Sequence, residues 1–399
     1  MIPLNGRSPG ERIKRKLSEN VTEKRLGLII NPIAGLGGRV GLKGSDGVVI
    51  QEQARALGAV PKALERTVQA IESLAPFKDE FELITCPGEM GAEAARATEF
   101  KPTIIGSIMP GATTPQDTID AASEMERLGV DLILFAGGDG TARDIFNAVA
   151  DRVPVLGIPA GVKIHSAVFG TNPRYAGELA GLYLQDKATL VREAEVMDID
   201  EEAVRAGVLS ARLFGYLKVP YRRNLVQAVK TGSNPGERET LHSIASDVLE
   251  NMDPECLYIL GPGTTTRTIT TLLGLEKTLI GVDVIAGDRL VAKDVNEEQL
   301  LELLDDQPAK VIVTPIGGQG YLFGRGNQQI SPRVLKSLEV GETQGKGNLI
   351  IISTTDKIFS LNGRPLLVDT GDQELDQLLS GYVQVVTGYK GRMIYRISS

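Results

Sequence analysis

The segment Gly137–Thr141, with the sequence Gly-Gly-Asp-Gly-Thr, is the strongest candidate for phosphate chemistry. It follows the most apolar stretch of the chain, Val130–Ala136, and a helical pattern over Ala142–Ala150 comes after it. Glycines permit positive φ and close backbone approach, and N–H groups at a helix N-terminus favour phosphate oxygens. We therefore expect Asp139, an acidic group inside an anion-binding loop, to hold Mg²⁺ or to accept a proton from an attacking hydroxyl. The structural alternative is a tight turn in which Asp139 caps the next helix.

Two further loops are expected at the same edge of one sheet. The apolar run Val130–Ala136, the glycine loop, the helix and a second apolar strand at Val153–Ile158 have the layout of a right-handed βαβ unit. Ligands of parallel sheets lie beyond the carboxyl ends of the strands. The strand Leu26–Ile30 runs into Asn31–Gly38, and Val153–Ile158 runs into Gly161–Ser166. Both loops are therefore expected beside the first.

Three side chains of these loops are candidates for direct roles. Asn31 is suited to a hydrogen bond with a ribose or a phosphate, and Lys163 supplies positive charge to a phosphate in transfer. His165 is a candidate general base, although a lone histidine more commonly makes a structural hydrogen bond. For the loop around Gly35, the structural alternative is a mobile glycine-rich connection.

The second half of the chain contains two more candidate anion-binding turns. The strand Cys256–Leu260 leads into Gly261–Arg267, which carries three threonines and an arginine, and a helix begins within Ile269–Leu273. The strand Lys310–Thr314 leads to Gly317–Gly320, which with Arg325 forms a third candidate. Such turns also serve as helix caps without a ligand, but three in one chain favour a ligand that carries a polyphosphate. Phosphoryl transfer fits these parts, because its catalysis is mostly positioning and charge stabilisation.

Composition excludes several classes of function. The chain has 399 residues, of which 42% are hydrophobic, enough for two or three domains with sizeable cores. A net charge of −8 and an aromatic content of 5% argue against a general nucleic-acid binder. Two cysteines make no disulfide framework, and two distant histidines disfavour a multi-histidine metal site. No stretch suits a membrane span or a secretory signal, so we expect a cytoplasmic protein that binds neither membrane nor nucleic acid.

The order of elements predicts an α/β protein with an N-terminal Rossmann-like parallel-sheet domain and a second, mixed α/β domain. Residues 1–25 are expected to form a basic extension, 26–165 the first domain and 166–399 the second, with the option that the last strands return to the first domain. The best break in composition lies at Gly232–Gly236, and the closing stretch Tyr382–Ile397 is interrupted at Gly388–Gly391 as a hairpin would be. A helix is expected after Pro61, with an apolar face formed by Leu64, Val68, Ile71 and Ala75. Another helix is expected to begin at Thr114-Pro115-Gln116-Asp117 and to end before Gly129.

Several of these segments together resemble a known family. Asn31-Pro32-Ile33-Ala34-Gly35 followed by Gly137–Thr141 resembles the ATP-NAD kinase superfamily, which also includes diacylglycerol and sphingosine kinases. The AcoX-like branch of ATP-NAD kinases is indicated more narrowly by Gly161–Lys163, Gly261–Arg267, Gly281–Asp283, Pro315–Gly320, Leu361–Pro365 and Val368–Asp372. The resemblance covers the chain from about Leu26 to its end.

The resemblance implies a kinase that phosphorylates the adenosine 2′-hydroxyl of NAD(H), with ATP or polyphosphate as donor and Mg²⁺ as cofactor. Asp139 would match the aspartate that contacts the substrate hydroxyl or the metal, and a homo-oligomer is expected. The residues expected to act in catalysis are Asp139 and Lys163, with Asp139 also as metal ligand. The residues expected to bind nucleotide are Asn31, Gly35, Gly137, Gly138, Gly140, Thr141, Gly263, Thr264, Thr265, Thr266, Arg267, Gly317 and Gly318.

Two other functions stay open at this point. One is a kinase that acts on a different hydroxyl, in a lipid or a small polyol. Diacylglycerol-type kinases carry Gly-Thr-x-Asn-Asp after the second strand, whereas this chain has Gly161-Val162-Lys163-Ile164-His165. The other is a nucleotide sensor, in which the loops bind ligand and no phosphoryl group moves.

Overall fold

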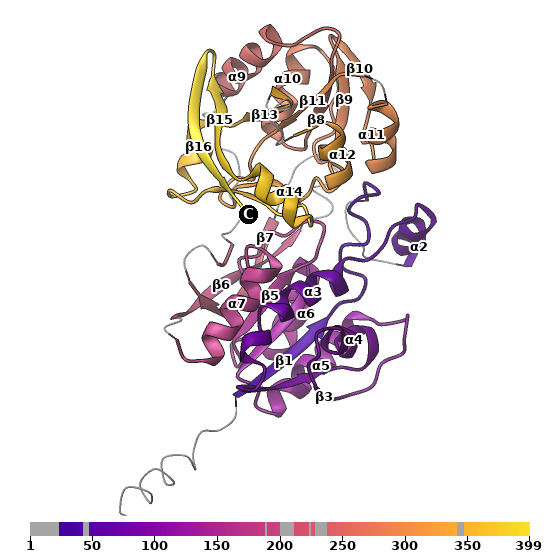
Figure 1. Ribbon diagram of the computed structural model, residues 1–399, viewed down its shortest axis with the longest axis vertical. Helices are drawn as coiled ribbons and strands as arrows, with labels where there is room; N and C mark the ends of the chain where they lie inside the picture. Colours follow the sequence, from indigo (N-terminus) through magenta and orange to yellow (C-terminus); the bar gives the residue numbers. More distant parts are fainter. Residues whose placement is uncertain are drawn as a thin grey trace, which may run out of the picture.

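The computed structural model describes residues 24–42, 48–187, 190–199, 211–222, 225–227, 238–305, 307–340 and 347–399. These residues form two α/β units, the first coloured indigo to magenta and the second orange to yellow in Figure 1. The predicted basic extension lies outside the described residues except for Lys24 and Arg25, and the predicted break at Gly232–Gly236 lies outside them as well.

The first unit contains a five-stranded sheet with the order β3-β2-β1-β4-β5, in which every pair of neighbours is parallel. Its strands are β1 (Lys24–Ile30), β2 (Phe81–Thr85), β3 (Thr103–Ile104), β4 (Leu132–Gly137) and β5 (Val155–Pro159). The chain adds β2 and β3 on one side of β1 and then places β4 and β5 on the other. The direction of winding therefore reverses between β1 and β4, and ligands of open α/β sheets bind at such a reversal.

Among the helices of the first unit, α3 contacts α7 and α4, and α5 contacts α6. The helices are α2 (Val48–Ala56), α3 (Ala63–Glu72), α4 (Ala92–Ala97), α5 (Pro115–Arg127), α6 (Asp139–Val149) and α7 (Pro173–Leu184), with short 3-10 turns at Ala75–Phe77 and Gly88–Met90. α5 begins as predicted, with proline in its first turn and a capping box between Thr114 and Asp117.

The buried face of α3 matches the predicted one in part, since Ile71 is buried and Val68 packs against the core. The helix buries Ala63, Thr67, Ala70 and Ile71, whereas Leu64 is 42% exposed. The reason is the close approach of α7, since a Cβ at Gly177 would lie 1.9 Å from the carbonyl oxygen of Ala70. Only small residues permit two helices to approach so closely, and the larger apolar side chain therefore faces outward.

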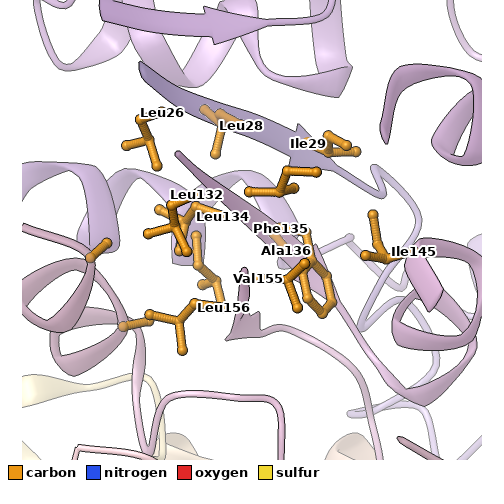
Figure 2. Packing of buried hydrophobic residues seen from close by; sticks show 14 of the residues in the cluster. Leu26, Leu28, Ile29, Leu132, Leu134, Phe135, Ala136, Ile145, Val155 and Leu156 are labelled. Carbon is orange, nitrogen blue, oxygen red and sulfur yellow. The ribbon is translucent and has the colours of Figure 1, made fainter. Parts of the chain in front are cut away.

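The central strands are buried because they are apolar on both faces, as parallel strands covered by helices must be. Figure 2 shows the side chains of β1, β4 and β5 packed together, with Ile145 of α6 against them. The same core continues through α7 and the two-stranded sheet of β6 (Leu190–Ile199) and β7 (Ala211–Tyr221), and it extends to Val226. The first packing unit therefore extends well past the boundary at residue 165 that the sequence suggested.

The second unit is a mixed nine-stranded sheet with the order β10-β9-β8-β11-β13-β15-β16-β14-β12. Its strands are β8 (Leu257–Leu260), β9 (Asp283–Ala286), β10 (Arg289–Ala292), β11 (Ala309–Val313), β12 (Tyr321–Phe323), β13 (Leu349–Ile352), β14 (Leu366–Val368), β15 (Gly381–Gly388) and β16 (Gly391–Ser398). Its helices are α9 (Arg238–Glu250), α10 (Thr264–Leu272), α11 (Glu297–Leu303), α12 (Pro332–Ser337), α13 (Thr355–Phe359) and α14 (Gln373–Leu379). The closing strands form the predicted hairpin and pair within this sheet, so they do not return to the first sheet.

Two apolar clusters cover the two faces of the second sheet. On β8, Leu257 and Ile259 belong to one cluster, while Tyr258 and Leu260 belong to the other. This alternation follows from the period of two along a strand. The mixed sheet and its helices confirm the mixed α/β character expected for the second domain.

Candidate active site

Three loops meet at the carboxyl edge of the first sheet. Asn31 follows β1, and its side-chain Nδ2 donates a hydrogen bond to Thr141 Oγ1 at 3.0 Å. Ala160 and Gly161 follow β5, and each donates its backbone N–H to the carbonyl oxygen of Gly137 at 2.9 Å. The structure therefore brings together the loops that the sequence placed side by side.

Glycines in these loops allow backbones and side chains to approach closely. A Cβ on Gly137 would lie 2.3 Å from Thr141 Oγ1, and a Cβ on Gly161 would lie 2.7 Å from the Cα of Gly138. Real Cβ atoms do not approach other atoms so closely, so larger residues here would push the two loops apart.

The conformational argument for glycine holds at only one of the predicted positions in these loops. Gly35 has φ +81°, whereas Gly137, Gly138 and Gly140 have no positive φ. Gly140 differs in another way, because a Cβ built there would meet no atom within 4 Å. Open space therefore adjoins the first turn of α6, at the end where backbone N–H groups point outward.

Asp139 is the first residue of α6 and is only 8% exposed. Its carboxylate accepts the backbone N–H groups of His165, at 2.8 Å, and Ser166, at 2.9 Å. It also accepts the Ser166 hydroxyl at 2.6 Å, and His165 Nδ1 lies 3.0 Å from Oδ2. We call this cluster of Asp139, His165 and Ser166 the Asp139 clamp.

The Asp139 clamp leaves the carboxylate no open acceptor site for a ligand. An ionised carboxylate has about four acceptor sites, and these donors fill them. The helix-cap alternative is not what the structure shows, since Gly138 is the N-cap and α6 has no side-chain cap. The role of Asp139 toward an acceptor hydroxyl or Mg²⁺ stays a prediction, and it requires the carboxylate to release at least one donor.

The other two clamp residues are buried parts of the same arrangement. His165 is 3% exposed and Ser166 is fully buried. The Ser166 hydroxyl also accepts the backbone N–H of Met197 at 2.9 Å, which ties the clamp to β6. The structural hydrogen bond expected for a lone histidine is therefore present.

The second unit contacts the loop that carries Lys163. Gln328 Nε2 and the backbone N–H of Gly326 both donate to the carbonyl oxygen of Val162, at 2.6 and 3.0 Å. Gln319 Nε2 donates to the carbonyl oxygen of Ile164 at 3.0 Å. Lys163, half-buried, packs beside Gly326, since a Cβ there would lie 3.8 Å from its Cγ. Lys163 therefore lies where the two units meet.

The predicted turn Gly263–Arg267 lies within the second unit. Gly263 has φ +124° and is the N-cap of α10. The Thr265 hydroxyl accepts Lys357 Nζ at 3.0 Å, and Thr314 Oγ1 accepts the same amine at 3.1 Å. Lys357 is a cation that the sequence reasoning missed. No hydrogen bond between described residues joins this turn to Gly137–Thr141.

The predicted turn at Gly317 and Gly318 is held by the loop after α13. The backbone N–H of Gly318 donates to Ser360 Oγ at 3.3 Å, and Arg364 Nη2 donates to its carbonyl oxygen at 2.6 Å. The neighbouring Gln319 reaches the first unit, as described above. Through Gln319, this turn contacts the loop that carries Lys163.

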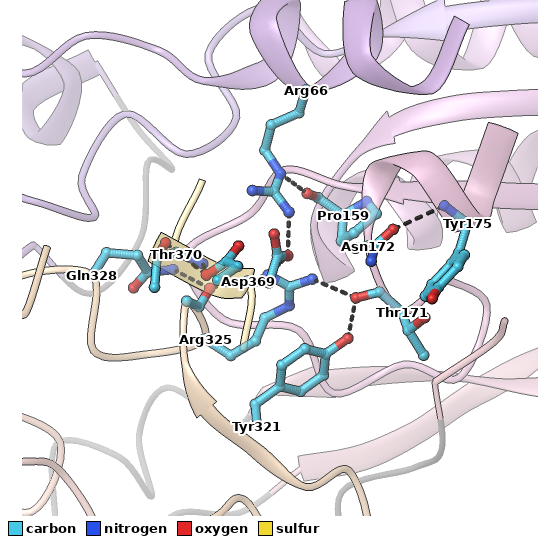
Figure 3. A network of polar contacts seen from close by, with 12 residues as sticks. Arg66, Pro159, Thr171, Asn172, Tyr175, Tyr321, Arg325, Gln328, Asp369 and Thr370 are labelled. Atoms are coloured by element: carbon cyan, nitrogen blue, oxygen red, sulfur yellow. Dashed lines mark hydrogen bonds and ion pairs between the residues drawn. The ribbon is translucent and has the colours of Figure 1, made fainter. Parts of the chain in front are cut away.

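An ion network joins the two units (Figure 3). Asp369, which follows β14, forms ion pairs with Arg66 of α3 and with Arg325, the latter at 2.6 Å. Arg66 Nε also donates to the carbonyl oxygen of Pro159 at the end of β5. Arg325 had been singled out in the sequence, whereas Arg66 and Asp369 had no assigned role there.

The same network continues into the loop before α7. Arg325 Nη2 donates to the carbonyl oxygen of Thr171 at 3.3 Å, and the Tyr321 hydroxyl donates to the same oxygen. Burial raises the pKa of Tyr321 to about 12, so this hydroxyl donates as a neutral group. The guanidinium of Arg325 also lies over the Tyr321 ring, 4.6 Å from its centroid.

A cavity of about 70 Å³ lies beside this network, between the two units. Its walls include Gly35 and Gly161 of the predicted loops, and four cations: Arg39, Lys62, Arg66 and Arg325. Asp139 is not among its lining residues. The cavity therefore borders two of the predicted loops, but the Asp139 carboxylate does not face it.

The residues that the structure describes contain no group of three histidine, cysteine, aspartate or glutamate side chains that could hold a metal. With its acceptor sites filled, the Asp139 carboxylate does not fit a Mg²⁺ ion in this arrangement. None of the helices in the described ranges is long and apolar enough to cross a bilayer.

Comparisons with solved structures yield weak likenesses. A protein from Bacillus anthracis str. Sterne that is assigned as a diacylglycerol kinase is 17% identical, with a TM-score of 0.25, over 45% of this chain and 46% of that one. A diacylglycerol kinase structure from the same strain gives 19% identity and a TM-score of 0.21, over 46% and 48% of the two chains. This chain thus spans about half the length of these structures. A search of curated proteins finds no match.

Family models give a stronger result. The model of the ATP-NAD kinase N-terminal domain matches residues 26–188, and the model of the ATP-NAD kinase C-terminal domain matches residues 253–397. Together they span the three loops, the Asp139 clamp and the interface network. The chain belongs to the ATP-NAD kinase family.

Proposed function

We propose that this protein is a kinase that transfers a phosphoryl group from ATP or polyphosphate to the 2′-hydroxyl of NAD(H), giving NADP(H). The observation that supports it most is the match of both ATP-NAD kinase domains to one chain, with the Gly137–Thr141 loop at the winding reversal of the first sheet. The proposed location is the cytoplasm.

In this proposal the first turn of α6 receives phosphate oxygens. Gly140 and Thr141 offer backbone N–H groups at the helix N-terminus, and the open space at Gly140 admits the ligand. Asn31 is fixed beside them by its hydrogen bond to Thr141. Lys163 supplies positive charge to the transferring group, and the turns Gly263–Arg267 and Gly317–Gly318 contact the rest of the nucleotide.

The reaction forms a bond between the acceptor oxygen and the terminal phosphorus, breaks the bond from that phosphorus to the bridging oxygen, and releases the acceptor proton. Asp139 serves it by holding the loop of Lys163 against the glycine loop, and it would contact the acceptor directly only on releasing a clamp donor. Proteins usually bind Mg²⁺ through substrate phosphates and one or two carboxylates, so Mg²⁺ would enter here with the nucleotide.

The test is NADP formation from NAD or NADH with ATP or polyphosphate, read by an NADP-specific dehydrogenase. Asp139→Asn is expected to lose turnover. Asp151→Asn is the matched control, because Asp151 is 70% exposed and forms a surface ion pair with Lys218 at 3.5 Å. If Asp139→Asn forms NADP at the wild-type rate, Asp139 has no role in the reaction. If the wild type forms no NADP, NAD(H) is not the phosphoryl acceptor.

One observation favours the nucleotide sensor as a second candidate. The Asp139 carboxylate is saturated by His165 and Ser166, which suits a loop that binds ligand without transferring a group. Saturable ATP or NAD binding, with no ATP consumption across NAD, lipid and polyol acceptors, would support the sensor. ATP consumption with a lipid or polyol alone would support a kinase for another hydroxyl.

A further inference from the structure

We infer that the cavity between the two units is a subsite for the phosphate group of a ligand, built by Arg66, Arg325, Arg39 and Lys62. We call it the interface subsite. The first unit supplies Arg39, Lys62 and Arg66, and the second supplies Arg325. The inference concerns binding and does not depend on which reaction the protein catalyses.

The charges of the interface subsite are unbalanced. Two carboxylates line it, and both are already paired: Asp369 with Arg66 and Arg325, and Glu65 with Lys62 at 2.6 Å. A single carboxylate thus serves two guanidinium groups whose side chains are 11% and 2% exposed. Burying a cation without full compensation is costly, so the wall is built to receive an anion.

Donors at the inner wall lack acceptors. Arg325 is 4% exposed, and its Nε is buried without a hydrogen bond. Arg66 uses Nε for Pro159 and Nη2 for Asp369, and its Nη1 makes no hydrogen bond to the described residues. A guanidinium has five N–H donors in a planar fork that matches phosphate oxygens. Oxygens of a phosphate would satisfy donors that the protein leaves open.

Another charge must be counted with this group. Asp376 of α14 accepts the backbone N–H and the hydroxyl of Thr370, which lines the cavity, at 3.0 and 2.7 Å. Burial, more than the nearby charge of Asp369, raises the pKa of Asp376 to about 6. Asp376 does not line the cavity. When ionised, it lowers the positive potential of the interface subsite but accepts no hydrogen bond from the four cations in the described structure.

The outer wall adds cations at the entrance. Arg39 is exposed and makes no ion pair with the described residues, so it is available to a ligand. Gln328 adds a hydrogen-bond acceptor to this wall, whereas the cations add donors. Its Nε2 is committed to the carbonyl oxygens of Val162 and Gly324, while its Oε1 is buried without a donor. A phosphate that carries a neighbouring hydroxyl, as in a sugar phosphate or nucleotide, would fit this wall best.

The test measures binding of inorganic pyrophosphate to the full chain by titration calorimetry. Removing a charge-assisted hydrogen bond weakens binding by about tenfold or more, so Arg39→Gln combined with Lys62→Gln should weaken it at least to that extent. Arg66→Lys keeps the charge but loses the fork, and it should also weaken binding. Arg127→Gln is the control, because Arg127 is 72% exposed on α5 and pairs with Glu124, and it should leave affinity unchanged.

Competition identifies the source of the phosphate. ATP, NAD, NADP and inorganic phosphate are each titrated against bound pyrophosphate, and the ligand that displaces it loses affinity in the same variants. Pyrophosphate that fails to bind the wild type, or that binds the double variant at wild-type affinity, overturns the inference. Because no turnover is needed, a protein that binds pyrophosphate here but forms no NADP would refute the proposed function and leave the interface subsite in place.

Discussion

Replacing Asp139 by asparagine should destabilise the protein, because the Asp139 clamp depends on four donors that converge on one carboxylate. They are the backbone N–H of His165, its Nδ1–H, and the N–H and hydroxyl of Ser166. An amide oxygen accepts two hydrogen bonds at most. Two buried donors therefore lose their acceptor, and the new NH₂ group faces donors.

The magnitude follows from that count. Each buried donor left without an acceptor costs about 1–3 kcal/mol, so two cost about 2–6 kcal/mol. Typical domains unfold at a cost of about 5–15 kcal/mol, so the variant should still fold while losing a large share of its stability. The loss should be confined to the first unit, since the clamp residues are buried beside its apolar core, to which Ala194 and Val196 of β6 belong.

The measurement is urea unfolding followed by far-ultraviolet circular dichroism, with Asp151→Asn as the control for an exposed aspartate. The midpoint for Asp139→Asn should fall clearly, and the control should match the wild type. If Asp139→Asn unfolds at the wild-type urea concentration, the carboxylate does not act as a clamp. Its burial would then need a different explanation.

Four further predictions concern single residues. Gly161→Ala should cost about 1–3 kcal/mol by overpacking, because its Cβ would lie 2.7 Å from the Cα of Gly138. A Cβ at Gly140 meets open space, so Gly140→Ala should gain about 0.5–1 kcal/mol in helix stability while losing phosphate affinity. Urea unfolding and phosphate binding, measured on both variants, should therefore show opposite changes in stability for Gly161→Ala and Gly140→Ala. Burial raises the pKa of Asp376 from 3.8 to about 6, so the folded state binds this proton more tightly than the unfolded chain and the stability it contributes is lost as pH rises from about 4 to about 6. Asp376→Asn should therefore stabilise the protein by up to about 3 kcal/mol at pH 7.5 and by almost nothing at pH 3, and equal gains at both would contradict this. Burial also raises the pKa of the Cys86 thiol to about 11, so native protein at pH 8 should resist alkylation there until urea is added.

The elements that the sequence predicted well carry local signals. Val130–Ala136 is apolar on both faces and bounded by a glycine loop, and it becomes β4 with a shift of its ends. Thr114 and Asp117 form the capping box that starts α5, because such a cap needs only residues three positions apart. The strand ends that meet at the sheet edge followed from the βαβ order alone.

What the sequence missed depends on pairs distant along the chain. Arg66 and Asp369 are 303 residues apart, and nothing near either residue indicates the other. The predicted face of α3 was wrong at Leu64 for a similar reason, because the close approach of Gly177 on α7 to Ala70 depends on a residue more than 100 positions away. The sequence singled out Asp139 but did not predict its hydrogen-bond donors. Any polar residue of the loop after β5 could have donated to the carboxylate as well as His165 and Ser166 do.

The Asp139 clamp resolves a conflict at the N-terminus of α6. A carboxylate in the first turn interacts well with the helix dipole, but it would compete with a phosphate for the same N–H groups. Here His165 and Ser166 hold that carboxylate away, Gly138 provides no side-chain cap, and Gly140 leaves the approach open. A helix end without caps requires other acceptors for its N–H groups. In the function we propose, the first turn of α6 receives the oxygens of a ligand, and Asp139 serves the site through the loop it holds.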